Sequence, residues 1–246
     1  MKTDSLVTRT VSGIVFVLVM VGMTLAWYDP ETESAGWPFY LLWVVLGLLT
    51  VGEYCRLLHS RLRGGSACTE TVWRLAGILY IGQAFVLIQL ADPMAVVTLM
   101  TVVWMADTGA YLVGSAVGRH PMAPVISPKK TWEGFGGGLL FAVGTALVWY
   151  SLYWRGQLAG GMELWSAAAY DGPQIGALKW AGFGLAVGLA ATGGDLIESK
   201  FKRWIGVKDS GKLIPGHGGL LDRLDALLLA VPVAWGYAWL TGLLGD

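Results

Sequence analysis

The sequence is poor in charge and in cysteine, and it lacks the common nucleotide and hydrolase motifs. Only 14% of its 246 residues are Asp, Glu, Lys or Arg, against roughly 25% in soluble domains. The two cysteines, Cys55 and Cys68, provide no disulfide framework and no zinc spacing. There is no P-loop, no Gly-x-Ser-x-Gly elbow, no His-Glu-x-x-His and no Cys-x-x-Cys. These absences argue against soluble kinases and hydrolases of those designs.

The sequence is instead rich in long apolar runs. The chain is 55% hydrophobic, and its mean hydropathy is +0.58. A transmembrane helix needs about 20 apolar residues. Seven stretches approach that length: about 10–28, 38–55, 72–90, 93–117, 134–154, 177–194 and 220–242. We therefore expect an all-α fold, a polytopic membrane helical bundle of about seven or more transmembrane helices. Residues 1–246 are expected to form a single membrane-embedded catalytic domain.

The basic residues predict how these spans are oriented. With the N-terminus inside, 15 of the 17 Lys and Arg residues fall in inner segments, as the positive-inside rule requires. A compact chain without a targeting extension suggests a multi-pass protein of a bacterial plasma membrane, with its active site facing the cytoplasm. Glycines four apart, such as Gly184 and Gly188, favour close helix packing and also permit a homodimer. We expect membrane lipids as partners and no nucleic acid.

One inner segment, residues 193–225, combines acids, bases and glycines at the mouth of a span. If the helix continues through Trp204, Asp195 and Glu198 are three residues apart, and Glu198 and Lys202 are four apart. Such pairs are neighbours on a helix surface. Ionisable residues lodged in membrane helices are functional candidates by default. The alternative interpretation is structural, with basic residues that anchor a helix end and an ion-paired start of the last helix.

The residue types in this segment suit polyphosphate chemistry. Mg²⁺ typically takes one or two carboxylates together with substrate phosphates, and Lys and Arg bind the remaining phosphate oxygens. Glycines let a loop approach a ligand closely, and a helix start offers free N–H groups. We therefore predict Asp195 and Asp222 as metal ligands. The predicted phosphate-binding residues are Lys202, Arg203, Lys208 and Arg223.

A second inner segment is polar and cationic. Asp107 lies within an apolar span, where it could serve a substrate cavity or a packing hydrogen bond. Further along is a short loop before a glycine-rich helix start, with Ser127, Lys129, Lys130, Thr131 and Glu133. Positive-inside anchoring explains these lysines, and so does binding of an anionic lipid headgroup.

Together these residues carry a family resemblance. The chain reads Ser199-x-x-Lys202-Arg203, Lys208-Asp209-x-Gly211 and Pro215-x-His217-Gly218-Gly219-x-x-Asp222-Arg223-x-Asp225, with unbroken spacing over 27 residues. This pattern resembles the signature of phosphatidate cytidylyltransferases, also called CDP-diacylglycerol synthases. The stretches Asp107–Tyr111 and Ser127–Gly134 are similar to the same family. One departure is the number of membrane spans: seven are predicted here, whereas members of the family are often assigned eight or more.

The resemblance implies that CTP and phosphatidate give CDP-diacylglycerol and pyrophosphate, with in-line attack on the α-phosphorus of CTP. It implies Mg²⁺ as cofactor, and a monovalent cation such as K⁺ as a candidate second ion. The catalytic set that it implies is Asp195, Lys202, Arg203, Lys208, Asp209, His217, Asp222, Arg223 and Asp225. The implied substrate-binding set is Asp107, Ser127, Lys129, Lys130, Thr131 and Glu133.

Three alternatives remain open. A CTP-dependent lipid kinase, or a cytidylyltransferase for another lipid phosphate, would need the same combination of polyanion and metal. A transporter would use buried acids and lysines as an ion path. Against a transporter, the charges cluster on one membrane face, and only Glu53 and Asp107 are expected to lie deeper.

Overall fold

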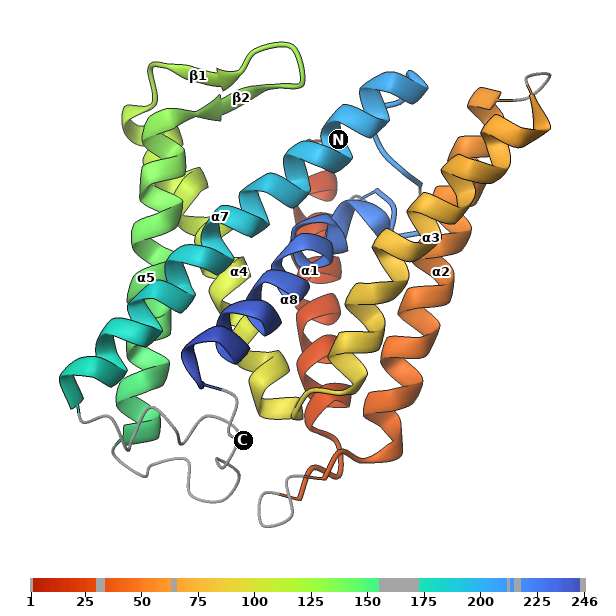
Figure 1. Cartoon of the computed structure of the whole chain (residues 1–246). Coiled ribbons are helices and arrows are strands. Elements are labelled where there is room, and N and C mark those ends of the chain that lie inside the picture. Colours follow the sequence, from red (N-terminus) through yellow and green to blue (C-terminus); the bar gives the residue numbers. More distant parts are fainter. Residues whose placement is uncertain are drawn as a thin grey trace.

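The structure is a computed structural model that describes residues 2–29, 34–62, 66–154, 173–211, 213–214 and 218–243. Within these ranges the chain forms seven helices and one two-stranded hairpin (Figure 1). In chain order they are α1 (Lys2–Leu25), α2 (Trp37–Leu62), α3 (Ala67–Gln89), α4 (Pro93–Val117), β1 (Pro121–Ala123), β2 (Ser127–Thr131), α5 (Trp132–Trp154), α7 (Pro173–Ile205) and α8 (Leu221–Thr241). The strands pair antiparallel.

The helices have the length and composition of membrane spans. Six of those in the described part of the chain are long and apolar enough to cross a bilayer, and α1 adds a shorter apolar stretch, Val11–Leu25. The predicted all-α, multi-pass membrane fold is confirmed. The span predicted at 177–194 was too short, because α7 continues to Ile205 as one helix.

The turn between α3 and α4 separates two full helices. Asp92 ends the turn, and its Oδ1 accepts hydrogen bonds from the backbone N–H of Met94 at 2.8 Å and of Ala95 at 3.0 Å. Pro93 occupies the first helical position, where its missing N–H costs nothing. The Asp-Pro pair therefore starts a new span rather than dividing one span into two short helices.

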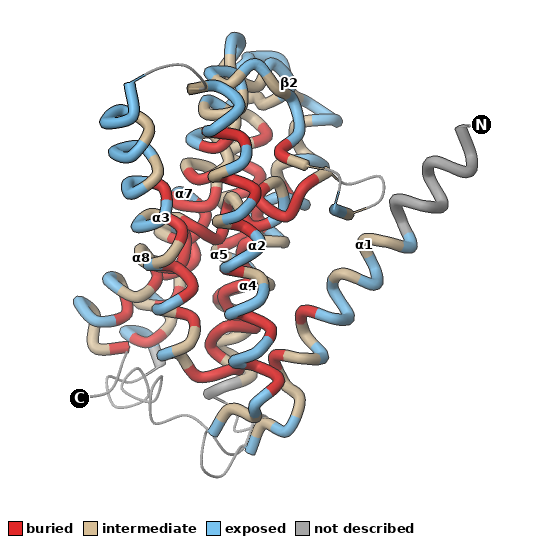
Figure 2. The backbone as a smooth tube through the Cα atoms, turned by 90° about the vertical axis from the view of Figure 1, so that its right-hand side faces the viewer, coloured by how far each residue is buried: buried red, intermediate tan, exposed pale blue. Residues whose placement is uncertain are grey.

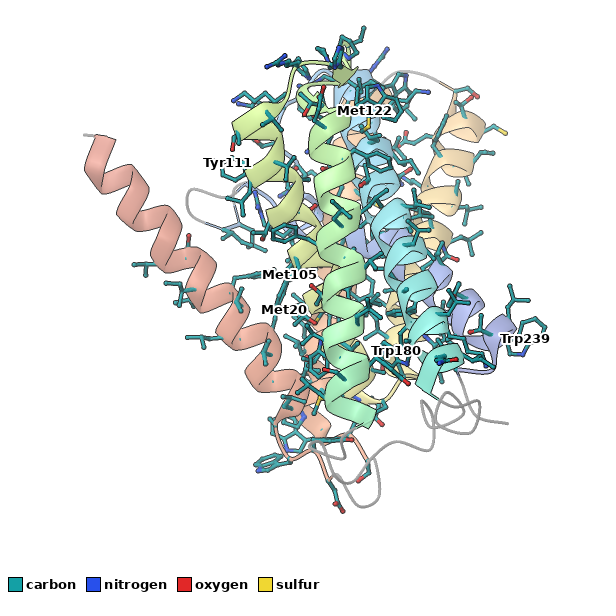
Figure 3. All side chains as sticks on the ribbon, turned by 90° about the vertical axis from the view of Figure 1, so that its left-hand side faces the viewer. Met20, Met105, Tyr111, Met122, Trp180 and Trp239 are labelled. Carbon is teal, nitrogen blue, oxygen red and sulfur yellow. The ribbon has the colours of Figure 1, made fainter. Side chains whose placement is uncertain are left out.

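The basic segments gather at one end of the bundle (Figure 1). We call this the basic end; it comprises the end of α2, the start of α3, the hairpin, the end of α7 and the start of α8. The start of α8 lies lower in Figure 1 than the end of α7, so the segment after α7 turns back into the bundle. Figure 3 shows Met122 at the hairpin and Trp239 projecting outward at the opposite end. The predicted one-sided arrangement of the basic segments is thus present in the fold.

The core and the surface are both apolar, as expected of a membrane protein. Trp43, Trp180 and Phe183 are fully buried between the helices. By contrast, Leu79 and Leu140 are 72% and 75% exposed. In a bilayer such residues contact lipid, and the helices satisfy their own backbone hydrogen bonds. Figure 2 shows the buried residues along the inner faces of the helices and α1 leaning away from the others.

Small residues let α4, α5 and α7 approach closely. A Cβ on Gly138 of α5 would lie 2.9 Å from the carbonyl oxygen of Ala106 in α4. On the other side of α5, a Cβ on Gly184 of α7 would lie 2.7 Å from the carbonyl oxygen of Ala142. These backbone contacts are the packing role expected for glycines four residues apart. They place the ends of α4, α5 and α7 side by side.

Candidate active site

The last turns of α7 carry a ladder of polar side chains. Glu198 Oε2 lies 2.5 Å from Lys202 Nζ, which confirms the contact predicted from their spacing. One turn earlier, the Ser199 hydroxyl donates a hydrogen bond to Asp195 Oδ1 at 3.1 Å. Continuous helix through Ile205 is what brings these residues onto neighbouring positions.

Lys202 links α7 to α8. Its ammonium group donates to Asp222 Oδ1 at 2.7 Å while it also pairs with Glu198. The side chains of Lys202, Glu198 and Asp222 are only 12%, 5% and 7% exposed. Removing one member of a buried ion pair leaves an uncompensated charge, which typically costs about 3–5 kcal/mol. This group of three therefore fixes the start of α8 against the end of α7.

The segment after α7 wraps around the other oxygen of Asp222. The backbone N–H groups of Ser210 and Gly219 each donate to Asp222 Oδ2 at 2.8 Å. Gly218 has φ +88°, and a Cβ there would lie 2.6 Å from the same oxygen. Asp222 thus receives three hydrogen bonds. As a metal ligand, it would have to share oxygens that already bind these donors.

Glu53 of α2 anchors the same segment, a role that was not predicted from the sequence. Its side chain is 6% exposed. Its Oε2 accepts hydrogen bonds from the N–H of Leu221 at 2.9 Å and from the Ser210 hydroxyl at 3.2 Å. Ser210 therefore contacts Glu53 through its hydroxyl and Asp222 through its N–H. The sequence did contain one indication of this role, because Glu53 is an acidic residue within the second predicted span, residues 38–55.

A backbone contact between α7 and α8 brings two further acids together. A Cβ on Gly194 would lie 2.5 Å from the carbonyl oxygen of Asp225 and 3.3 Å from the Cα of Ala226. The next residue, Asp195, interacts electrostatically with Asp225. Asp225 also accepts a hydrogen bond from the Ala226 N–H at 2.7 Å. The packing of the two helices therefore holds these two carboxyl groups close to each other.

The hairpin joins this group through Lys130. The Nζ of Lys130 on β2 lies 2.5 Å from Asp195 Oδ2 on α7. Asp107 of α4 interacts electrostatically with Asp195, Lys130 and Arg223. The two polar segments identified in the sequence, although far apart in the chain, therefore meet in one cluster.

Two predicted substrate-binding residues stabilise the hairpin itself. Thr131 Oγ1 accepts a hydrogen bond from the Gly134 N–H at 3.1 Å and caps α5. Glu133 Oε2 accepts from the N–H groups of Arg119 and His120, at 3.1 and 3.2 Å, and Glu133 Oε1 pairs with the His120 ring. These contacts hold β1 and β2 on the end of α5, so that Lys130 can reach Asp195.

The remaining predicted residues lie around the cluster. Arg203 is exposed, and its Nε donates to the carbonyl oxygen of Ile126 at 3.3 Å. Ser127 is half-buried on β2. The exposed predicted residues on this face are Lys129, Lys208, Asp209 and Arg223. His217 lies outside the described residues.

Comparison with known proteins decides the family. The model of the cytidylyltransferase family matches residues 2–241. The chain belongs to the cytidylyltransferase family. The family resemblance predicted from the motif is therefore confirmed for the cytidylyltransferase family as a whole.

The curated relatives match a little more than half of the chain. A phosphatidate cytidylyltransferase of Mycobacterium bovis is 43% identical over 137 residues, which cover 56% of this chain and 39% of that protein. A phosphatidate cytidylyltransferase of Staphylococcus aureus (strain COL) is 42% identical over 132 residues, 54% of this chain and 44% of that protein. The chain therefore matches these relatives over less than half of their length.

In this member of the cytidylyltransferase family, the interacting acids outnumber the interacting bases. The acids are Asp107, Asp195, Glu198, Asp222 and Asp225, and the bases are Lys130, Lys202 and Arg223. Carboxylate oxygens are among the ligands that Mg²⁺ prefers. No three His, Cys, Asp or Glu side chains already converge to hold a metal within the described ranges. Because Mg²⁺ usually takes only one or two carboxylates plus substrate phosphates, the residues fit such an ion.

Proposed function

We propose that the chain transfers a cytidylyl group from CTP to phosphatidate, giving CDP-diacylglycerol and pyrophosphate. The observation that carries the proposal is the ion pair between Lys130 on β2 and Asp195 on α7, because it joins the two motif segments in one acid- and base-rich cluster. The names of the curated relatives support the same reaction.

The position of the cluster suits two substrates that come from different phases. CTP is soluble and highly charged, whereas the phosphate of phosphatidate is tethered to the bilayer by its acyl chains. The cluster lies at the ends of membrane-spanning helices, where both phosphates can reach it. Lysine and arginine side chains nearby provide charge-assisted hydrogen bonds to phosphate oxygens.

In the proposed reaction, a phosphate oxygen of phosphatidate forms a bond to the α-phosphorus of CTP. The bond between that phosphorus and the bridging oxygen of the β-phosphate breaks, and pyrophosphate leaves. A phosphate monoester is already largely ionised near neutral pH, since its second pKa is about 6. A strong general base is therefore unnecessary, and we expect catalysis to come from positioning and charge neutralisation, as in phosphoryl transfer.

The chain's own residues would divide this work. Lys202, fixed between Glu198 and Asp222, presents a buried positive charge that cannot swing away. Lys130 is 25% exposed and tied to Asp195, so it can exchange that partner for a phosphate oxygen. The lipid phosphate is assigned to the hairpin, and the triphosphate is assigned to Lys202, Arg203, Lys208 and Arg223.

The proposal includes a divalent cation, Mg²⁺, held by Asp195 and Asp222 with Asp225 beside them. When bound, such an ion neutralises charge on phosphate oxygens. A monovalent ion such as K⁺ is a candidate for a second position in the same acidic cluster. We also place the basic end on the cytoplasmic side of a bacterial plasma membrane, following the positive-inside distribution. The glycine-lined helices are compatible with a homodimer.

The decisive test is a reaction with purified protein in detergent, CTP, phosphatidate and Mg²⁺. Label from the α-phosphate of CTP should enter the lipid, and pyrophosphate should appear in equal amount. Transfer of γ-label alone would assign the chain to the lipid kinases instead. Absence of both products, with Asp222→Asn protein as the blank, would refute the proposed activity.

A further inference from the structure

An apolar cavity of about 460 Å³ lies beside the acid cluster and is lined by residues of α2, α3, α7 and α8. Aromatic side chains form much of its wall: Tyr54, Trp73, Tyr80, Phe201 and Trp204. Ile81 and Leu228 line its deeper part, and Glu198 and Asp225 border it. The volume is in the range of small-molecule binding sites, about 300–1,000 Å³. Glu198 and Asp225 thus form, together with Lys200, the polar edge of an otherwise apolar site.

The cavity extends from the basic end into the membrane-spanning part of the bundle. Along α3 its lining runs from Trp73 to Ile81, which corresponds to about 12 Å at the rise of an α-helix. Three lining residues, Trp73, Ile197 and Trp204, are 44%, 49% and 38% exposed. In Figure 2 the first turns of α3 stand away from the bundle and are exposed. The site is therefore open on its lipid-facing side, between α3 and α7.

We propose that this cavity binds an acyl chain of the lipid substrate, with the chain's ester group near the carboxylate edge. The inference rests on the proposed function for the identity of the headgroup. An occupant that enters from the bilayer is apolar, and an occupant that reaches Glu198 and Asp225 must end in a polar group. A phospholipid meets both conditions, and Lys200 on the same edge provides the positive charge that an anionic headgroup needs.

Hydrophobicity alone does not explain such binding, because the tails of membrane lipids are already in hydrocarbon. A specific polar contact is needed, and Tyr80 offers one. Its hydroxyl is buried and has no hydrogen-bond partner among the residues that the structure describes. A buried O–H group is costly unless it is hydrogen-bonded. By contrast, the Tyr54 hydroxyl in the same wall donates to the carbonyl oxygen of Trp73 at 2.7 Å. Tyr80 is thus the donor available to an ester carbonyl.

The first experiment fills the cavity. Ala76 lines it, and Ala76→Trp should lower kcat/KM for dioleoyl phosphatidate at least tenfold while the KM for CTP stays unchanged. The short-chain substrate dihexanoyl phosphatidate should be affected much less. The matched control is Leu79→Trp, three residues further along α3, because Leu79 is 72% exposed and does not line the cavity. Equal behaviour of the two variants would overturn the inference.

The second experiment isolates the Tyr80 hydroxyl. A hydrogen bond between neutral groups is typically worth a factor of about three to ten, so Tyr80→Phe should raise the KM for dioleoyl phosphatidate by that factor. A phosphatidate analogue with ether-linked chains lacks the ester carbonyls and should show the same loss with the original protein. Combining the variant with the analogue should give no further loss. Fully additive losses would contradict the contact.

The third experiment does not depend on turnover. Phosphatidate with a diazirine in the middle of one acyl chain is photolysed with the protein in vesicles, and labelled peptides are mapped by mass spectrometry. Labels are expected near Ile81 and Leu228. Such labels without any CDP-diacylglycerol formation would refute the proposed function and leave the acyl-chain site standing. Normal turnover with labels only on exposed faces, or labelling of the cavity by a photoreactive cytidine nucleotide instead, would overturn the acyl-chain site.

Discussion

Replacement of Glu53 by alanine tests how the candidate site is held in place. Glu53 accepts hydrogen bonds from Leu221 N–H and from the Ser210 hydroxyl, and both donors are buried. Ser210 in turn donates its N–H to Asp222 Oδ2. Glu53→Ala should therefore release the segment that orients Asp222, although Glu53 itself touches no proposed substrate.

The size of the effect follows from the two donors. A buried donor left without an acceptor costs about 1–3 kcal/mol. If the two unsatisfied donors together destabilise the ordered conformation of this segment by about 3 kcal/mol, kcat/KM for CTP should fall by about 100-fold. Glu53→Gln keeps one acceptor oxygen, which can serve both donors because they share Oε2. Only the charge is lost, and since charge-assisted hydrogen bonds are about twice as strong as neutral ones, we expect a loss of only about tenfold.

The assay compares steady-state kinetics for both substrates with thermal unfolding in detergent. The matched control is Arg56→Ala, because Arg56 is 67% exposed and its Nη2 lies 3.9 Å from Glu53 Oε1. Exposed ion pairs contribute about 0–1 kcal/mol, so this variant should stay close to the original rates. Glu53→Ala should affect the CTP parameters more strongly than the KM for phosphatidate.

Two results would refute the reasoning. One is an unchanged kcat/KM for CTP in Glu53→Ala protein. The other is a lower unfolding temperature with an unchanged kcat/KM for the folded fraction, which would mean that Glu53 contributes to stability alone.

Three further predictions concern the cluster directly. Asp222→Asn should reduce turnover to below about 1% while membrane insertion persists, because loss of a charge-assisted contact of about 3 kcal/mol is worth about 100-fold; near-normal rates would contradict the metal and lysine contacts assigned to Asp222. Lys130→Ala should raise the KM for phosphatidate more than Lys129→Ala, because Lys130 pairs with Asp195 whereas Lys129 is exposed; identical, unchanged lipid dependence would leave both lysines as membrane anchors. Gly218→Val should lower CTP turnover at least tenfold, since a φ of +88° and the nearby Asp222 oxygen oppose any side chain; a fully active variant would show that the segment tolerates another conformation.

The sequence predicted the helices well because each span is a long apolar run with few interruptions. It also predicted the contact of Glu198 with Lys202, which depends only on the geometry of a single helix. The end of α7 was harder to predict, because Lys202 and Arg203 look like residues beyond a span. In the structure the helix continues, since Glu198 and Asp222 compensate the charge of Lys202.

The contacts between distant segments could not be predicted from helical spacing. The meeting of Lys130 with Asp195 depends on the path of the hairpin, and the role of Glu53 depends on a segment that turns back into the bundle. Both contacts join residues more than 60 positions apart in the chain. Likewise, the cavity beside the cluster is formed by four helices and has no local pattern.

The contact at Gly194 fixes the separation of two acids. Because backbone atoms of α7 and α8 touch there, the helix segments that carry Asp195 and Asp225 cannot move apart. A divalent cation that binds carboxyl oxygens would therefore find both acids in place, without waiting for the helices to close.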